Sequence, residues 1–285
     1  MKRFVPYGIL IVCLMVAATG IVLHNTYFSK QNHGESRLHL EEIYTQINQS
    51  VSAALAENWT DLKEWDQVIR YMDTDDEKVR EGLEEIIGKH RLIEDFYFIS
   101  ENGSYITVDG RKGYLNIGQD LPALMKDKKE VVSDSTLPSG EKIIVFAVPV
   151  EKHTYGDFAY SALAMSYKED YLGELLDVEV FSGKGRCYIA YNDGRILVDS
   201  AKGKEPVFSN MLTYLADNAK FRDRTSDDVI SDWNKGIAGV TAYEDVSGRD
   251  LPEGTDYYFV YLPMEFDNWM FTGFIAESIV HQRMK

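Results

Sequence analysis

Two stretches of this 285-residue sequence resemble each other: Phe96–Ile106, which reads FYFISENGSYI, and Cys187–Leu197, which reads CYIAYNDGRIL. In each, a run of apolar residues leads into an Asn-Gly or Asp-Gly dipeptide and then into a second run. These dipeptides adopt the positive φ angles that a tight turn needs, so each stretch predicts a β-hairpin. The chain is therefore expected to contain two hairpin-led units.

A second pair of matching stretches follows in the same order. Ile144–Val150 (IVFAVPV) matches Tyr258–Met264 (YFVYLPM), and a turn and a long final strand come after each. Proline cannot donate a hydrogen bond to a neighbouring strand, so Pro149 and Pro263 are expected to end their strands. One hairpin repeat is weak evidence, but two repeats in one order predict two modules of one fold. Each module is expected to be a mostly antiparallel sheet with helices on one side, the α+β class.

Apolar residues at a period of two predict the strands of these modules. The expected strands are Asp95–Ile99, Tyr105–Val108, Lys142–Val150, Phe158–Tyr167, Arg186–Tyr191, Arg195–Asp199, Gly236–Tyr243, Tyr257–Met264 and Trp269–Ala276. Before the first hairpin, helical spacing predicts helices that begin at Arg37 and at Thr60, and a capping box at Thr74–Glu77 opens a third. A short helix is predicted at Asn210–Asn218.

The N-terminus has the pattern of a membrane anchor. Residues 4–23 contain no charge, and at about 1.5 Å per residue a helix of this length spans the roughly 30 Å hydrocarbon core of a bilayer. The basic residues at positions 2 and 3 place residues 1–3 in the cytoplasm and everything from residue 24 onward outside the cell. The alternative is a cleaved signal peptide with a small-residue segment at 17–19, although the apolar run continues past it.

Composition disfavours several classes of function. With 30 basic and 46 acidic residues the net charge is −16, which argues against a nucleic-acid partner because phosphate binding needs clustered Lys and Arg. Two cysteines, Cys13 and Cys187, give no disulfide framework and no zinc site. The six histidines form no close metal-binding pair, no G-x-S-x-G elbow occurs, and the lone G-x-G at 183–185 is expected to be a loop. We therefore expect no catalytic residue, no metal and no cofactor.

Apolar residues recur at helical spacing after Arg37. This stripe consists of Leu38, Leu40, Ile43, Tyr44, Ile47, Val51, Ala54 and Leu55. It has two possible uses: a seam between two copies of the chain, or a face packed on its own domain, which is the commoner use. The sequence leaves both open, and a homodimer through this stalk helix is one expectation.

The order of these features resembles a known family. An N-terminal membrane helix, an extended helix and two hairpin-led α+β modules resemble the double Cache sensor regions of bacterial transmembrane receptors. The ending, from Tyr261–Met264 to Asn268–Ile275, resembles the last hairpin of such sensors, and the overall order resembles clostridial hybrid sensor histidine kinases and diguanylate cyclases. The resemblance covers about residues 37–280. It implies two PAS-like modules, with a small ligand usually held in the one farther from the membrane.

The resemblance also implies how the chain is divided. Residues 24–90 are expected to form the stalk and distal helices, 91–177 the membrane-distal module and 178–280 the membrane-proximal module. Residues 281–285 are then the start of a connection to a second membrane helix, with a kinase or cyclase beyond it in a longer receptor.

Candidate ligand-binding residues are aromatic and charged side chains associated with the distal module, because small-molecule pockets are mostly apolar with a few polar groups. They are Trp65, Arg70, Tyr71, Tyr97, Tyr105, Arg111, Asp157 and Tyr160. The helix residues of this set are expected to face its strand residues, an arrangement that rests partly on the resemblance. Amino-acid-binding members of the family carry a compact run of Arg, Trp and Tyr that this chain lacks, which disfavours an amino-acid ligand, and the sequence does not identify the ligand.

Two classes of function follow from the sequence. The favoured one is the extracytoplasmic ligand-sensing region of a transmembrane signalling receptor, itself not an enzyme. The alternative is a membrane-anchored extracytoplasmic enzyme such as a hydrolase, which needs a nucleophile with its base, or a metal site. No such set of residues is visible in the sequence.

Overall fold

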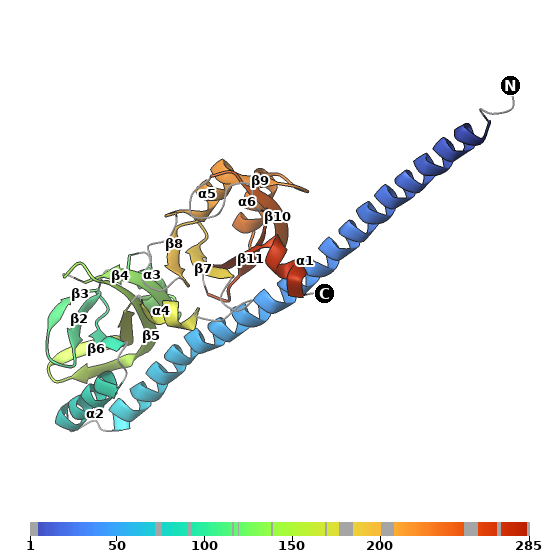
Figure 1. Cartoon of the computed structure of the whole chain (residues 1–285). Coiled ribbons are helices and arrows are strands. Elements are labelled where there is room, and N and C mark those ends of the chain that lie inside the picture. Colours follow the sequence, from blue (N-terminus) through green and yellow to red (C-terminus); the bar gives the residue numbers. More distant parts are fainter. Residues whose placement is uncertain are drawn as a thin grey trace.

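The computed structural model describes residues 5–71, 76–89, 93–115, 117–118, 120–137, 139–168, 170–176, 185–200, 208–247, 256–266 and 269–283, with side chains from residue 34 onward except those of 76, 86, 89, 170 and 283. One long helix carries two modules along its C-terminal half (Figure 1). We call the module farther from the N-terminus of this helix distal and the nearer one proximal.

The long helix, α1 (Val5–Tyr71), contains 67 residues and is about 100 Å long at 1.5 Å per residue. The expected break before Thr60 is wrong, because residues 56–60 contain neither Gly nor Pro and the helix continues through them. Asn58 is held within the helix and to the distal module at once: its side-chain amide donates to the Leu55 carbonyl at 3.0 Å and to the Tyr171 hydroxyl at 2.9 Å.

Residues 5–23 of the expected membrane segment, 4–23, fall in the N-terminal part of α1, and their side chains and residue 4 lie outside the described residues. Within the part of the chain that is described, no helix combines the length and the apolar character needed to cross a bilayer.

The distal module contains a six-stranded antiparallel sheet in the order β3-β2-β1-β6-β5-β4. Its strands are β1 (Ile93–Ile99), β2 (Ser104–Thr107), β3 (Lys112–Tyr114), β4 (Val131–Thr136), β5 (Lys142–Tyr155) and β6 (Phe158–Lys168). Its helices are α2 (Asp76–Lys89), α3 (Asp120–Met125) and α4 (Asp170–Leu175). The predicted Thr74 of the capping box before α2 lies outside the described residues.

The proximal module contains a second six-stranded antiparallel sheet, in the order β8-β7-β12-β11-β10-β9. Its strands are β7 (Arg186–Tyr191), β8 (Ile196–Asp199), β9 (Ala219–Phe221), β10 (Gly239–Asp245), β11 (Asp256–Pro263) and β12 (Trp269–Ala276). Its helices are α5 (Met211–Asn218), α6 (Ser226–Asn234) and α7 (Glu277–Arg283).

The two sheets confirm the internal repeat. The order β2-β1-β6-β5-β4 in the distal sheet corresponds to β8-β7-β12-β11-β10 in the proximal sheet. The two predicted hairpins occupy equivalent positions, and their turn glycines, Gly103 and Gly194, both have a φ of 84°. A side chain at either glycine would be strained in this left-handed conformation, which is why the Asn-Gly and Asp-Gly dipeptides mark these turns.

The two prolines behave differently from each other. Pro263 is the last residue of β11, as expected, whereas Pro149 lies inside β5, which continues to Tyr155. The register between β5 and β6 shifts between Pro149 and His153, so a bulge accommodates the proline and lets the strand resume.

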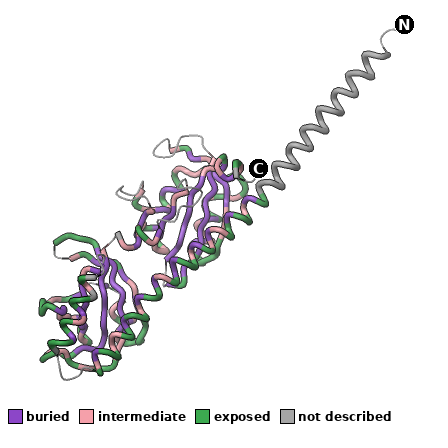
Figure 2. Tube along the Cα trace, turned by 60° about the horizontal axis from the view of Figure 1, so that its bottom comes forward, coloured by how far each residue is buried: buried purple, intermediate pink, exposed green. Residues whose placement is uncertain are grey.

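Helices cover both faces of the proximal sheet, and α1 and α3 lie on opposite faces of the distal sheet, so the expectation of helices on one side is wrong for both modules. On one face α1 packs through Leu40 and Tyr44, and on the other α5 and α6 pack through residues such as Leu215 and Trp233. The strands β7, β11 and β12 are buried along nearly their whole length (Figure 2). Because alternate residues of such strands point to opposite faces, both faces need a cover.

The apolar stripe of α1 packs within its own chain. Leu40, Tyr44, Ile47, Val51 and Leu55 are each at most 8% exposed and belong to one core that α1 shares with both sheets. By contrast, Leu38 is 69% exposed. The stripe beyond Leu38 is therefore an intramolecular face, and a dimer would have to use another face of α1.

The final strand lies directly against α1. Gly273 of β12 lies under the ring of Tyr44, and a Cβ atom at Gly273 would overlap that ring. Near the same level Arg37 pairs with Asp223 at 2.5 Å, and α7 leaves the sheet beside α1 (Figure 1). The incoming helix and the outgoing strand are thus in direct contact.

Candidate functional site

The distal sheet sorts its side chains into two layers. Phe96 and Phe98 of β1 join the core beneath α1, whereas Tyr97 and Ile99 join a second core on the opposite face. Residues from the 115–125 segment, which includes α3, cover this opposite face. The candidate site is on this opposite face, at its β1–β3 side.

Two of the residues predicted from sequence, Tyr97 and Tyr105, meet on this face. Their ring centroids are 5.0 Å apart and their planes are nearly perpendicular, at 84°. The hydroxyls of Tyr97 and Ser166 are hydrogen-bonded at 3.0 Å, while the Tyr105 ring lies over Gly113. Tyr97 is 1% exposed and Tyr105 is half-buried, so the site offers one fixed ring and one accessible ring.

A pair of opposite charges lies beside these rings. Asp95 precedes Tyr97 by two residues on β1 and therefore shares its face. An Nη atom of Arg111 donates to the Asp95 carboxylate, and its Nε atom donates to Asp109 at 2.8 Å. The Asp95 side chain is 8% exposed and that of Arg111 is 64% exposed. The site thus combines a buried carboxylate with an accessible guanidinium.

Burial of the Asp95 carboxyl raises its pKa from 3.8 to about 6. The positive charge of Arg111 and a hydrogen bond from the Phe96 amide, at 2.9 Å, act in the opposite direction but are outweighed. The Arg111 pair is largely open to water on the arginine side, which weakens its Coulomb attraction relative to a fully buried pair. The carboxyl therefore gains its charge only near neutral pH.

Because the folded chain holds the Asp95 proton more tightly than the unfolded chain, Asp95 contributes its stabilisation at low pH and loses it as the pH rises through about 6. The unfolding free energy of the native chain minus that of Asp95→Asn should therefore fall between pH 4 and pH 7, by on the order of 3 kcal/mol. Urea titrations of both proteins across this range measure it. If this difference rises with pH instead, the pair with Arg111 outweighs burial in setting the pKa of Asp95.

Three predicted residues lie where α1 packs on the other face of the distal sheet: Trp65 and Arg70 on α1, and Tyr160 on β6. Tyr160 is 1% exposed within that core, and Trp65 packs partly buried against it. Arg70 pairs with Asp66 and with Glu151, each at 3.0 Å. The sheet separates this group from Tyr97 and Tyr105, so the helix residues do not face those two strand residues.

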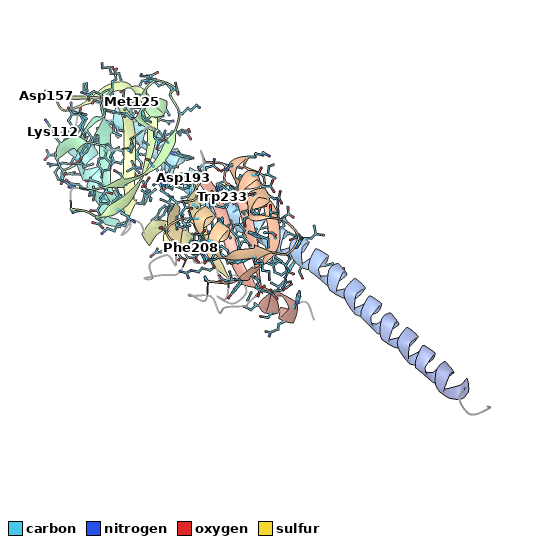
Figure 3. All side chains as sticks on the ribbon, turned by 90° about the horizontal axis from the view of Figure 1, so that it is seen from above. Lys112, Met125, Asp157, Asp193, Phe208 and Trp233 are labelled. Carbon is cyan, nitrogen blue, oxygen red and sulfur yellow. The ribbon has the colours of Figure 1, made fainter. Side chains whose placement is uncertain are left out.

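The remaining two predicted residues lie elsewhere again. Tyr71, the last residue of α1, is 93% exposed. Asp157, in the turn between β5 and β6, lines a cavity of about 470 Å³ with Arg80 and Lys112, and Figure 3 labels Asp157 and Lys112 at the same end of the distal module. The eight predicted residues therefore form no single site: Tyr97, Tyr105 and Arg111 come together on one face of the distal sheet, and Trp65, Arg70 and Tyr160 come together on the other.

Two residues of this cluster, Asp95 and Ser166, were not among the predicted ones. Asp95 is an acidic residue inside an otherwise mostly apolar strand, IEDFYFI, and this contrast was a readable signal of a buried charge. Ser166 gave no such signal, because its pairing with Tyr97 depends on β6 lying next to β1.

The matching face of the proximal module is filled by aromatic side chains. Phe208 and Tyr214 stack with ring centroids 4.1 Å apart, and the Trp233 indole donates to the Asn192 carbonyl at 2.9 Å (Figure 3). The buried carboxylate of Asp245 accepts hydrogen bonds from the Tyr214 hydroxyl and, at 2.6 Å, from a serine hydroxyl. These polar groups find their partners inside the module.

Two features of the described residues concern metal binding and nucleophilic chemistry. Across them, no group of three or more His, Cys, Asp or Glu side chains is placed to hold a metal ion. Burial raises the pKa of the Cys187 thiol to about 12, so it stays protonated and is a poor nucleophile. The first two residues of the G-x-G at 183–185 lie outside the described residues.

No family model matches the sequence, and a search of curated proteins finds no match either. Solved structures do match. The extracellular domain mmHK1S-Z3, assigned to a histidine kinase, is 15% identical, with a TM-score of 0.57, 87% of this chain covered and 97% of that one.

Two chemoreceptor domains match as well. The ligand-binding domain of CtaA from Pseudomonas fluorescens, in complex with L-isoleucine, is 12% identical, with a TM-score of 0.58 and coverage of 88% and 96% of the two chains. The ligand-binding domain of the amino-acid chemoreceptor PctC from Pseudomonas aeruginosa, in complex with GABA, is 17% identical, with a TM-score of 0.53 and coverage of 83% and 98%. With its two antiparallel sheets carried on one N-terminal helix, this chain has the Cache-type fold of the extracellular ligand-binding domains of histidine kinases and chemoreceptors.

Proposed function

We propose that this chain is the extracytoplasmic ligand-sensing region of a bacterial transmembrane signalling receptor of the histidine kinase or diguanylate cyclase type. The fold match over more than four fifths of the chain supports it. The observation that carries the proposal is the distal cluster of Asp95, Tyr97, Tyr105 and Arg111, which places a buried anion, a cation and an accessible aromatic ring together on one face.

The ligand class we propose is a small zwitterion, such as an amino acid. The ligand carboxylate would take the free donors of Arg111, which has five N–H groups, and the ligand ammonium would take the remaining lone pairs of Asp95. The half-buried ring of Tyr105 would pack on the apolar part. Two of the similar structures hold GABA and L-isoleucine, which are zwitterions of this kind. This chain lacks the compact Arg-Trp-Tyr run of the amino-acid-binding members, and the charges that would bind the ligand are those of Asp95 and Arg111 instead.

The N-terminal segment of α1 is the proposed membrane anchor. The uncharged residues 4–23, with basic residues at 2 and 3, support a single span with the modules outside the cytoplasm. A homodimer remains part of the proposal. It would use a part of α1 outside the buried stripe, such as the surface around Leu38, which is 69% exposed, because the stripe is already occupied.

We expect at least one compound from a panel of the standard L-amino acids and GABA to raise the melting temperature of the full chain in nanodiscs. A ligand that binds only the folded chain stabilises it by about 2.7 kcal/mol at roughly 100-fold excess over Kd. Tyr105→Ala should weaken the binding of that compound by about tenfold or more, a loss of about 1.4 kcal/mol.

Tyr114→Ala is the matched control, since Tyr114 lies on the neighbouring strand and is 74% exposed. It should leave the affinity unchanged. The zwitterion proposal fails if no compound of the panel shifts the melting temperature, and the placement fails if Tyr105→Ala and Tyr114→Ala behave alike.

A further inference from the structure

A cleft separates the two modules on the side of β4. It comprises a cavity of about 560 Å³ and an adjoining one of about 370 Å³, and both are lined by Asp134, Tyr191 and Arg195. Asp134 belongs to the distal module, and the other two belong to the hairpin β7–β8 of the proximal module. Each cavity is in the size range of small-molecule sites.

Elements of both modules and the long helix meet at the larger cavity. Trp59 of α1 and Trp269 at the start of β12 both line it, so aromatic rings from the long helix and from the final strand reach the same space. The Trp59 indole is held in place by donating to the Val131 carbonyl of β4 at 3.1 Å. The rings of Tyr191 and Trp269 are nearly perpendicular, with centroids 6.2 Å apart. The aromatic lining is therefore fixed by its own contacts.

The charged groups of the larger cavity are mostly acidic. Asp120, Glu130 and Asp134 line it, against one arginine, Arg195. Lys63 pairs with Glu130 from outside the lining, and the lining itself holds three carboxylates and one guanidinium. This excess of negative charge in the lining favours a positively charged ligand.

The site already holds a cation of the chain itself. The guanidinium carbon of Arg195 lies 4.5 Å from the centroid of the Tyr191 ring, and its Nε atom pairs with Asp193 at 2.8 Å. The Tyr191 hydroxyl donates to Asp134, which ties the two modules together. The Arg195 side chain is 58% exposed, so this cation is at the mouth of the cleft and can move aside. A ring face beside a carboxylate is the arrangement that binds organic cations.

We propose that this cleft between the modules is a second ligand site, separate from the distal cluster, and that it takes an organic cation with a small apolar portion. The cationic group would lie between the Asp134 carboxylate and the face of Tyr191, and the apolar portion would pack on Trp59 and Trp269. Such a ligand contacts α1, the distal sheet and the proximal sheet together. Its binding would therefore stabilise one relative position of the two modules.

Calorimetric titration of the full chain in nanodiscs with choline, putrescine and agmatine tests the proposal. At least one of the three should bind, and for choline the uncharged carbon isostere 3,3-dimethylbutanol should bind at least about tenfold more weakly. Asp134→Asn should weaken binding of the cation by about tenfold or more. Arg195→Ala should strengthen it, because the internal cation no longer occupies the ring.

Asp217→Asn, which removes an exposed carboxylate elsewhere on the proximal module, is the matched control and should change nothing. The proposal is overturned if none of the three cations binds, or if Asp134→Asn and Asp217→Asn have equal effects. It is also overturned if Asp95→Asn abolishes the binding, because the cation would then be in the distal cluster.

Discussion

Gly273→Val is expected to destabilise the proximal module by about 3 kcal/mol or more, the upper end of what overpacking a core costs. The reason is geometric: a Cβ atom at Gly273 would overlap the ring of Tyr44, which is fully buried between α1 and β12. Neither partner can easily move, since β12 is paired on both sides, with β7 and with β11. Urea unfolding followed by the fluorescence of Trp233 and Trp269 measures the change.

Gly82→Ala is the matched control, because nothing lies within 4 Å of a Cβ at Gly82 in α2. It should stabilise α2 by about 0.5–1 kcal/mol, since glycine in a helix interior carries an entropic penalty. The double variant Tyr44→Ala with Gly273→Val should be less destabilised than the sum of the two single variants. Additive effects would mean that the contact between Tyr44 and Gly273 is not what forbids a side chain at position 273.

Leu55→Ala is expected to cost about 2–5 kcal/mol of stability, the range for truncating a buried leucine. Leu55 is fully buried in the core that α1 shares with the sheets, so the substitution leaves a cavity inside the chain. The same urea titration, followed through Trp59 and Trp65, measures it.

Gln49→Ala, on the exposed side of α1, serves as the comparison and should change stability by no more than about 0.5 kcal/mol. The effect of Leu55→Ala distinguishes packing of the apolar stripe within one chain from a seam between two chains. If Leu55→Ala instead left stability intact and changed only the oligomeric state, the stripe would be a seam between chains and its intramolecular packing would be wrong.

Strands were the most predictable part of the fold. The bounds of β7 and β12 agree with the predicted Arg186–Tyr191 and Trp269–Ala276, because aromatic and β-branched residues fill both strands. In contrast β4 was missed, since two of its inward positions are Ser133 and Ser135 and the strand shows no apolar alternation. The helix α6 was also missed, although its capping box of Thr225 and Asp228 is a signal that sequence can show.

The candidate site was only partly predictable, because the sequence does not show which face of the sheet each strand residue occupies. Tyr97 and Tyr105 were correctly brought together because they lie on the two strands of one hairpin. Trp65 and Tyr160 were expected to join them, but they lie under α1 on the other face of the sheet. Which face a strand turns to a helix depends on packing between distant segments, and a shift of one residue reverses it.

The central claim is that the distal face opposite α1 holds the ligand. Hydrogen–deuterium exchange of the full chain in nanodiscs, with and without the panel compound that raises the melting temperature most, tests this claim directly. We expect slower exchange in β1, in β2 and in the covering residues of α3, because ligand contacts there suppress local opening. Slower exchange confined to the proximal sheet, or to the segments beneath α1, would contradict the account.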